Sequence, residues 1–148
     1  MHSRFPFAEE KMYTLCLSGA EINMLYDMAR QRTAEIMAKH PSRVTNAERI
    51  VLMGLIKYSS IVEQIISANH VRGIPVDNVQ YSVEMSAITL ASLLVEAQRQ
   101  YHLLNSKPAW EHTSTEERRL GSLWVFCRIA ERIVDQDRAK MASSGPGL

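Results

Sequence analysis

Apolar residues recur along most of the chain at the spacing of amphipathic helices, and only one short segment alternates as a strand does. Residues 11–17 carry Tyr13, Thr14, Leu15 and Cys16, which are residue types that favour an extended strand. After this segment the apolar period becomes helical and stays so almost to the C-terminus. The sequence therefore predicts a mainly α protein, with one short N-terminal strand followed by about four helices that pack as a bundle.

Two capping boxes mark where the first two helices begin. Ser18 starts the sequence S-G-A-E and Thr45 starts T-N-A-E, so in each a hydroxyl and a glutamate three residues later satisfy the helix N-terminus. The first helix ends before Pro41, because the residue before a proline avoids the helical region. The second runs to about residue 69 and is apolar on most of its circumference, which predicts burial on several sides. We expect this second helix to be the folding core, with Ile61 and Ile65 among its buried positions.

Two more helices are predicted in the second half of the chain. Asp77 or Asn78 caps the first of them, and its apolar positions between 83 and 104 follow a heptad spacing. The sequence S-T-E-E at 114–117 is a third capping box and opens the last helix. We expect 77–141 to form an antiparallel helical hairpin on the first two helices. No internal repeat is evident.

The length of 148 residues fits one domain, and 46% hydrophobic and 22% charged residues are ordinary for a globular chain. We expect a single domain over 1–148, in which 11–70 forms one structural unit. An irregular arm at 1–10, a turn at 70–76 and a flexible tail at 142–148 complete the outline.

Charge and cysteine usage restrict the environment. The 17 Lys+Arg and 16 Asp+Glu residues give a net charge of +1, so nucleic-acid binding needs a local basic patch. The two cysteines, Cys16 and Cys127, lie in apolar patterns and predict buried thiols in a reducing compartment. The densest apolar run, Ile50–Ile56, is shorter than a membrane span, and the first ten residues do not form a signal peptide. We expect a cytoplasmic protein with no membrane partner.

Catalytic and metal-binding patterns do not stand out. No two of the five histidines have the i, i+4 spacing of a helical metal site, and no serine lies in a G-x-S-x-G elbow. No nucleophile or base has a partner that the spacing identifies. The sequence predicts a protein that is not an enzyme and needs no cofactor.

Residues 12–31, MYTLCLSGAEINMLYDMARQ, resemble the ribbon-helix-helix family of dimeric DNA-binding proteins. Leu17 and Ser18 end the strand as in that family, and Leu25, Met28 and Ala29 match its first helix. The start of the second helix, from Thr45 to Ile50, is also similar, although the first helix and its turn are longer than in the family.

The resemblance implies that one strand from each of two subunits pairs into a ribbon that enters the major groove. Alternate residues of the strand would then face the bases, while Tyr13, Leu15 and Leu17 face the core. The N-terminus of the second helix would lie near a phosphate. The implied DNA-binding residues are Met12, Thr14, Cys16, Arg43, Thr45, Asn46 and Arg49.

Two functions remain open at this point. The preferred hypothesis is a dimeric DNA-binding regulator or accessory protein, in which 77–141 is an added region for oligomerisation or a protein partner. The alternative is an all-helical interaction module, such as an adaptor, inhibitor or assembly factor, that binds no DNA. The strand followed by a capped helix favours the first, whereas the near-neutral charge favours the second.

Overall fold

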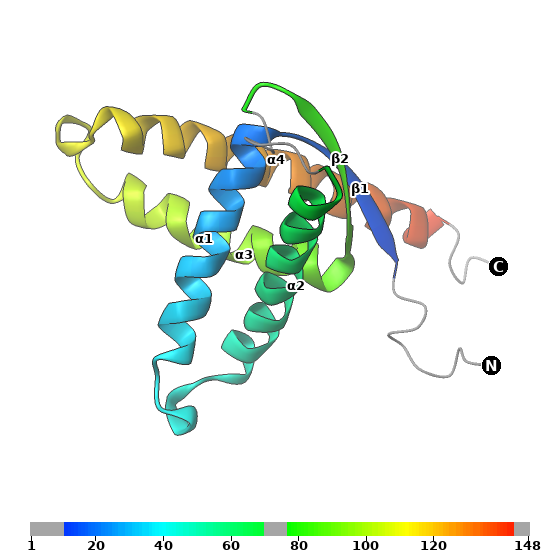
Figure 1. Ribbon diagram of the computed structural model, residues 1–148, viewed down its shortest axis with the longest axis horizontal. Coiled ribbons are helices and arrows are strands. Elements are labelled where there is room, and N and C mark those ends of the chain that lie inside the picture. The colour runs from blue at the N-terminus through cyan, green and yellow to red at the C-terminus, as the bar shows by residue number, and fades with distance from the viewer. Residues whose placement is uncertain (1–10, 70–76, 144–148) are drawn as a thin grey trace. The chain divides into compact units, whose positions relative to one another are not determined.

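The computed structural model describes residues 11–69 and 77–143 of the chain (Figure 1). Its elements are, in order, β1 (Met12–Ser18), α1 (Gly19–Met37), a 3-10 helix (Pro41–Arg43), α2 (Asn46–Asn69), β2 (Gln80–Ser86), α3 (Ala87–Asn105), a second 3-10 helix (Ala109–Glu111) and α4 (Ser114–Ser143). The predicted fold class, mainly α, is confirmed. The predicted arm at 1–10 and turn at 70–76 lie outside the described residues, as does the tail beyond Ser143.

The chain divides into two compact units, Met1–Glu96 and Ala97–Leu148. Among the described residues, the first unit contains both strands, α1, α2 and the first half of α3. The second contains the rest of α3 and α4. Each unit is described by itself below.

A second strand, β2, is the largest difference from the sequence prediction. Residues 80–86 are extended and α3 begins only at Ala87, so neither Asp77 nor Asn78 caps that helix. The cap is Ser86, whose Oγ accepts a hydrogen bond from the Thr89 amide at 3.3 Å. Val83 fits both a heptad and a period-two pattern, and the heptad concealed the alternation of apolar and polar residues in this strand.

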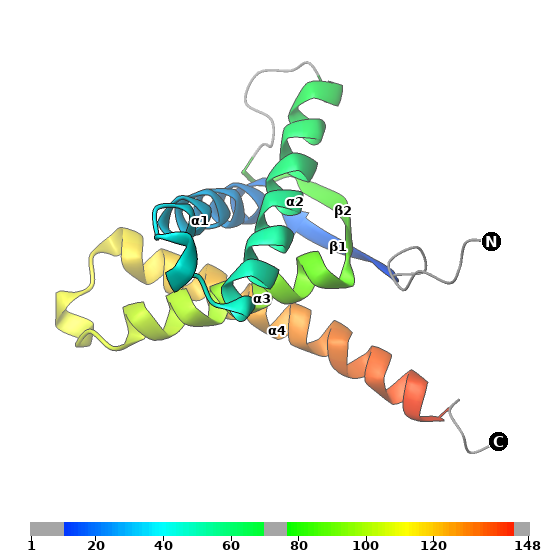
Figure 2. The same cartoon turned by 90° about the horizontal axis from the view of Figure 1, so that it is seen from below.

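β1 and β2 pair antiparallel along their whole length, as Figures 1 and 2 both show. The register places Leu15 opposite Val83 at the centre of the ribbon. Leu15, Leu17, Val83 and Met85 are each at most 2% exposed, so one face of the ribbon belongs to the core. β1 thus has its partner strand within its own chain, and this removes the ground on which a homodimer was predicted. The homodimer itself stays a prediction.

The two halves of the chain repeat the same order of elements, contrary to the expectation of no internal repeat. The first residue of β2, Gln80, follows the first residue of β1, Met12, by 68 residues. The same offset separates the first residue of α1 from that of α3, and the first residue of α2 from that of α4. Leu15 and Val83, which face each other in the ribbon, are also related by this offset. Each residue of β1 therefore has its repeat equivalent at the symmetric place on β2. The ribbon thus has a local two-fold axis between Leu15 and Val83.

Two of the three predicted capping boxes are confirmed where they were expected. The Glu21 amide donates to Ser18 Oγ at 3.1 Å, and the Ser18 amide donates to Glu21 Oε1 at 2.8 Å. The box at Thr45 is equally complete. The third box begins one residue earlier than predicted: Thr113 pairs with Glu116, because Thr113 also offers a hydroxyl and has a glutamate three residues on.

The buried side of α2 is not the one predicted. Leu55, Tyr58 and Val62 are fully buried, whereas Ile61 and Ile65 are only half-buried. The Tyr58 hydroxyl donates to the Ile22 carbonyl oxygen at 3.0 Å and so ties α2 to α1. The expectation of burial all round is therefore wrong, and several apolar side chains of this helix are exposed. They are Ile50, Met53, Ile56 and Ile66.

Within the described residues, α2 is the one helix long and apolar enough to cross a membrane by length and composition, over Asn46–Ala68. One side of it packs closely against α3. A Cβ on Gly54 would collide with the side chain of Ser92 in α3 and lie 2.8 Å from the Ile88 carbonyl oxygen. Ser92 Oγ also donates to the Ile50 carbonyl oxygen at 3.4 Å. A glycine is required here because the two helices approach closely.

Candidate nucleic-acid interface

The face of the ribbon opposite the core is exposed and is the surface that the strand prediction concerns. Met12, Thr14 and Cys16 of β1 are all exposed and alternate with the inward Leu15 and Leu17, as the resemblance to the ribbon-helix-helix family implied. β2 adds a second row with the same alternation. The outer ribbon face, as we call it, consists of Met12, Thr14, Cys16, Gln80, Ser82 and Glu84.

Side chains on the outer ribbon face lie next to one another across the two strands. Thr14 is paired with Glu84 and Cys16 with Ser82. Cys16 Sγ also donates to Gln80 Oε1 at 3.4 Å, which is a diagonal cross-strand contact. The face is therefore a compact row of small and polar groups with little net charge.

Sequence reasoning missed the contribution of β2 because it assigned those residues to a helix. A signal was present: Tyr13 and Ser18 of β1 recur as Tyr81 and Ser86 at the repeat offset. The outward residues between them differ in identity, so a comparison of identities alone does not reveal the repeat.

The remaining predicted site residues form a separate group at the turn between α1 and α2. Arg43, Thr45, Asn46 and Arg49 are all exposed there. This turn lies at the end of α1 remote from the ribbon (Figure 1). A helix of 19 residues is about 28 Å long at ~1.5 Å per residue. The structure does not bring these residues next to the strand, because α1 is long.

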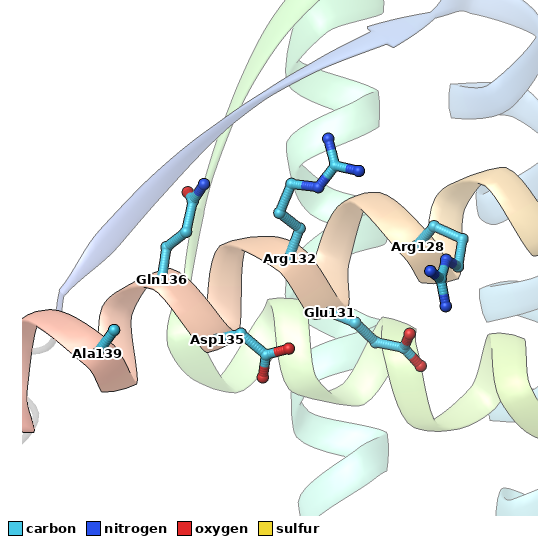
Figure 3. A pocket seen from close by; sticks show the side chains of 6 residues that line it. All are labelled: Arg128, Glu131, Arg132, Asp135, Gln136 and Ala139. Carbon is cyan, nitrogen blue, oxygen red and sulfur yellow. The ribbon is translucent and has the colours of Figure 1, made fainter.

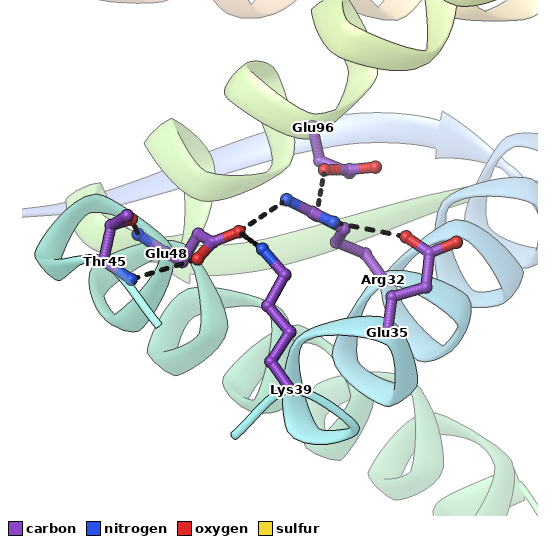
Figure 4. Close-up of polar contacts among 6 residues, drawn as sticks. All are labelled: Arg32, Glu35, Lys39, Thr45, Glu48 and Glu96. Carbon is purple, nitrogen blue, oxygen red and sulfur yellow. Dashed lines mark hydrogen bonds and ion pairs between the residues drawn. The ribbon is translucent and has the colours of Figure 1, made fainter. Parts of the chain in front are cut away.

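The N-terminus of α2 is already occupied by a carboxylate (Figure 4). The Thr45 amide donates to Glu48 Oε1 at 3.0 Å, and the Glu48 amide donates to Thr45 Oγ1 at 3.0 Å. Two cations contact Glu48 Oε2: Lys39 through Nζ, and Arg32 through Nη2 at 3.2 Å. A phosphate at this helix end would meet a negative charge, and two nearby cations are engaged with that charge.

These contacts hold the Glu48 carboxyl ionised. The hydrogen bond from Lys39, supported by the Thr45 amide and the nearby Arg32, lowers the pKa of Glu48 from 4.5 to about 2. Arg32 also contacts Glu35 Oε1 at 3.2 Å and the buried Glu96 Oε1 at 3.3 Å (Figure 4). One guanidinium therefore joins α1, α2 and the first half of α3.

The cations of the turn are partly engaged with the protein itself. Arg49 Nη2 donates to the Pro41 carbonyl oxygen at 3.3 Å. Arg43 lines a shallow hollow with Lys39, His40 and Ser42. This hollow is the most basic part of the turn.

A second hollow runs along α4 in the other unit (Figure 3). Arg128 and Arg132 lie one helical turn apart, and Glu131 and Asp135 lie beside them. The Arg128 guanidinium also stacks over the Trp124 ring, 5.6 Å from its centroid. The two acids balance the two arginines, so this surface offers no excess of positive charge to a phosphate backbone.

The cysteines and the histidines complete the search for chemistry. In the described part of the chain no group of three His, Cys, Asp or Glu residues is arranged to hold a metal ion. Cys127 is buried as predicted, and burial raises its pKa to about 11. Cys16 is exposed, contrary to the prediction that both thiols are buried, because it lies on the outward side of β1.

No family model, no curated protein and no solved structure matches the chain. The likeness to ribbon-helix-helix proteins is therefore structural: an N-terminal strand leads directly into a capped helix. This arrangement is consistent with that family without being diagnostic of it.

Proposed function

We propose that this protein binds duplex DNA by inserting the outer ribbon face into the major groove. The observation that carries the proposal is a two-stranded antiparallel ribbon with local two-fold symmetry and one exposed face. The major groove, about 12 Å wide, admits such a ribbon. In ribbon-helix-helix proteins the two strands come from two subunits; here one chain supplies both.

The chemistry of the face suits contact with base edges better than contact with phosphates. Thr14 and Ser82 carry hydroxyls, and Gln80 carries an amide, which are groups that pair with donors and acceptors in the groove. Few cations lie on the ribbon, so we expect a shallow dependence of affinity on salt. The role proposed for the protein, regulator or accessory factor, follows from such site-specific binding.

Fluorescence anisotropy with a labelled duplex of random sequence, followed by selected duplexes, tests the proposal. The Thr14→Ala, Ser82→Ala double variant should bind selected DNA at least about tenfold more weakly, since each base contact contributes roughly 1–3 kcal/mol of discrimination. Its melting temperature should stay unchanged, because both side chains are exposed. Leu15→Ala, one residue along, should instead lower the melting temperature.

The Arg43→Ala, Arg49→Ala double variant is the matched control. These residues lie at the remote turn, so we expect binding to selected DNA to be unchanged. No binding to any duplex at low salt would overturn the proposal. Binding that survives loss of Thr14 and Ser82 would also overturn it and would redirect attention to Arg118, Arg128 and Arg132 of α4.

The second candidate is a protein-interaction module without DNA binding. The exposed apolar side chains of Met37, Ile50, Met53 and Ile56 favour it, with exposed fractions of 67, 56, 49 and 48%. An amphipathic partner could cover side chains of this kind. The anisotropy experiment separates the two candidates, because this one predicts no duplex binding.

A further inference from the structure

We infer that the ribbon recognises a DNA site whose two halves differ in sequence, so that the protein binds in a single orientation. This inference rests on the proposed DNA binding and specifies its target. It depends on the difference between the outward side chains of β1 and those of β2, which a pair of identical strands would not have.

The backbone of the ribbon is symmetric, whereas its outward side chains are not. Residues separated by the repeat offset occupy equivalent places about the local two-fold axis between Leu15 and Val83. On the outer ribbon face, the symmetry-equivalent pairs are Met12 and Gln80, Thr14 and Ser82, and Cys16 and Glu84. Only the central pair of hydroxyls is chemically alike. Each half of a bound site would therefore meet a different set of groups.

The β1 set is mostly apolar. Met12 has a thioether, Thr14 a methyl beside its hydroxyl, and Cys16 a thiol with weak hydrogen-bonding capacity. Apolar contacts in the major groove select the methyl group of thymine. We expect the bases that β1 contacts to be mostly A·T pairs and to tolerate substitution.

The β2 set is strongly polar. Gln80 can bond in bidentate fashion to the N6 and N7 atoms of adenine, and Glu84 can accept from the N4 amino group of cytosine. Glu84 lies opposite Thr14, one residue from the centre of the ribbon, so it faces base edges rather than the phosphates at the groove rim. The weak Cys16–Gln80 contact holds the Gln80 amide over the face and is easily exchanged for a base. We expect the bases that β2 contacts to be read more strictly.

Selection from a library of random duplexes tests this inference with the full chain. The native protein should select a motif that is not palindromic. Gln80→Ala and Glu84→Ala should each relax one or two positions and lower affinity for the native site roughly tenfold or more. The relaxed positions should lie on opposite sides of the motif's centre, because the register places Glu84 beside Thr14 and Gln80 at the other end of the ribbon. Met12→Ala should have a smaller effect, on the same side of the centre as Glu84.

Two symmetrised ribbons make the sharper test. The triple variant Gln80→Met, Ser82→Thr, Glu84→Cys gives both strands the β1 set, and Met12→Gln, Thr14→Ser, Cys16→Glu gives both the β2 set. Each should select a palindrome, and the two palindromes should differ, because one repeats the base contacts of β1 and the other repeats those of β2. Circular dichroism melts check that the variants fold, which we expect because all six positions are outward.

The outcomes separate the two proposals. A palindromic motif from the native chain, or binding without any motif, would overturn the asymmetric site while leaving DNA binding intact. Symmetrised variants that fold, bind and still select the native motif would overturn it as well. Failure of the native chain to bind duplex DNA at low salt would overturn the proposed function itself.

Discussion

The turn between α1 and α2 and the turn between α3 and α4 are built in the same way, although their surroundings differ. In each, a lysine near the end of a helix contacts the glutamate of the next capping box, as Lys39 does with Glu48 and Lys107 with Glu116. The cap is a threonine both times, Thr45 and Thr113. Every one of these residues is related to its counterpart by the repeat offset.

The comparison shows which positions the repeat retains. Groups that fix the backbone recur, because a cap or a core contact is needed wherever the same turn is made. Outward groups have changed, as on the outer ribbon face, where Cys16 corresponds to Glu84. The two halves thus share a scaffold and differ in the chemistry that they present, and four predictions test how far this holds.

The core positions should show the largest effects. Leu55 and Leu123 are equivalent and fully buried, so Leu55→Ala and Leu123→Ala should each lower the free energy of unfolding by about 2–5 kcal/mol in urea melts. Ile56→Ala, at a position 48% exposed, is the control and should cost less than about 1 kcal/mol. A small loss at Leu123 alone would show that the two halves do not share a core pattern.

Gly54 of α2 and Gly121 of α4 should respond to an added methyl group with opposite signs. Gly54→Ala forces a Cβ against Ser92 and the Ile88 carbonyl and should cost about 1–3 kcal/mol. Nothing lies within 4 Å of a Cβ on Gly121, so Gly121→Ala should stabilise by up to about 1 kcal/mol through helix propensity. Equal effects in denaturant melts would contradict the close approach of α2 and α3.

The two capping glutamates, Glu48 and Glu116, should contribute differently to the pH dependence of stability in acid. The folded-state pKa of Glu48 is about 2, below its ordinary 4.5, so its contribution to stability is present above pH 4.5 and is lost as the pH falls towards 2. Glu116 has a pKa lowered less far, mainly by the Thr113 amide and Lys107. Glu48→Gln should therefore flatten the acid limb of the stability profile more than Glu116→Gln. The reverse order would show that Arg32 adds nothing to the first turn.

Substitution of His112 should have the smallest effect on stability, and this effect should depend on pH in the range above 6.5. Its hydrogen bond to Glu117, supported by the Leu104 carbonyl, raises its pKa above 6.5. The stabilisation is thus complete below pH 6.5 and is lost as the pH rises through the raised pKa. The equivalent residue in the first half is Val44, which has no ionisable side chain. His112→Gln should remove this dependence in melts between about pH 6 and 9.

Features that depend on residues close in sequence were predicted correctly for much of this fold. Features that depend on residues far apart in sequence were not. The boxes at Ser18 and Thr45 were identified because a cap depends on residues three apart. β2 was missed because its pairing joins residues that are far apart in sequence, such as Leu15 and Val83, and because Val83 fits two periodicities. The outward face of β1 followed from alternation. The separation of Arg43 and Arg49 from that face depends on the length and direction of α1, which a resemblance to a shorter hairpin does not supply.

Closure of the ribbon within one chain has a consequence for dilution. A ribbon shared between two subunits comes apart as protein concentration falls, because its formation is a second-order process. Here the encounter of β1 with β2 is first-order, and its entropic cost is set by the intervening chain rather than by the number of molecules present. A cell holding only a few copies of this protein would therefore have the ribbon assembled in each of them.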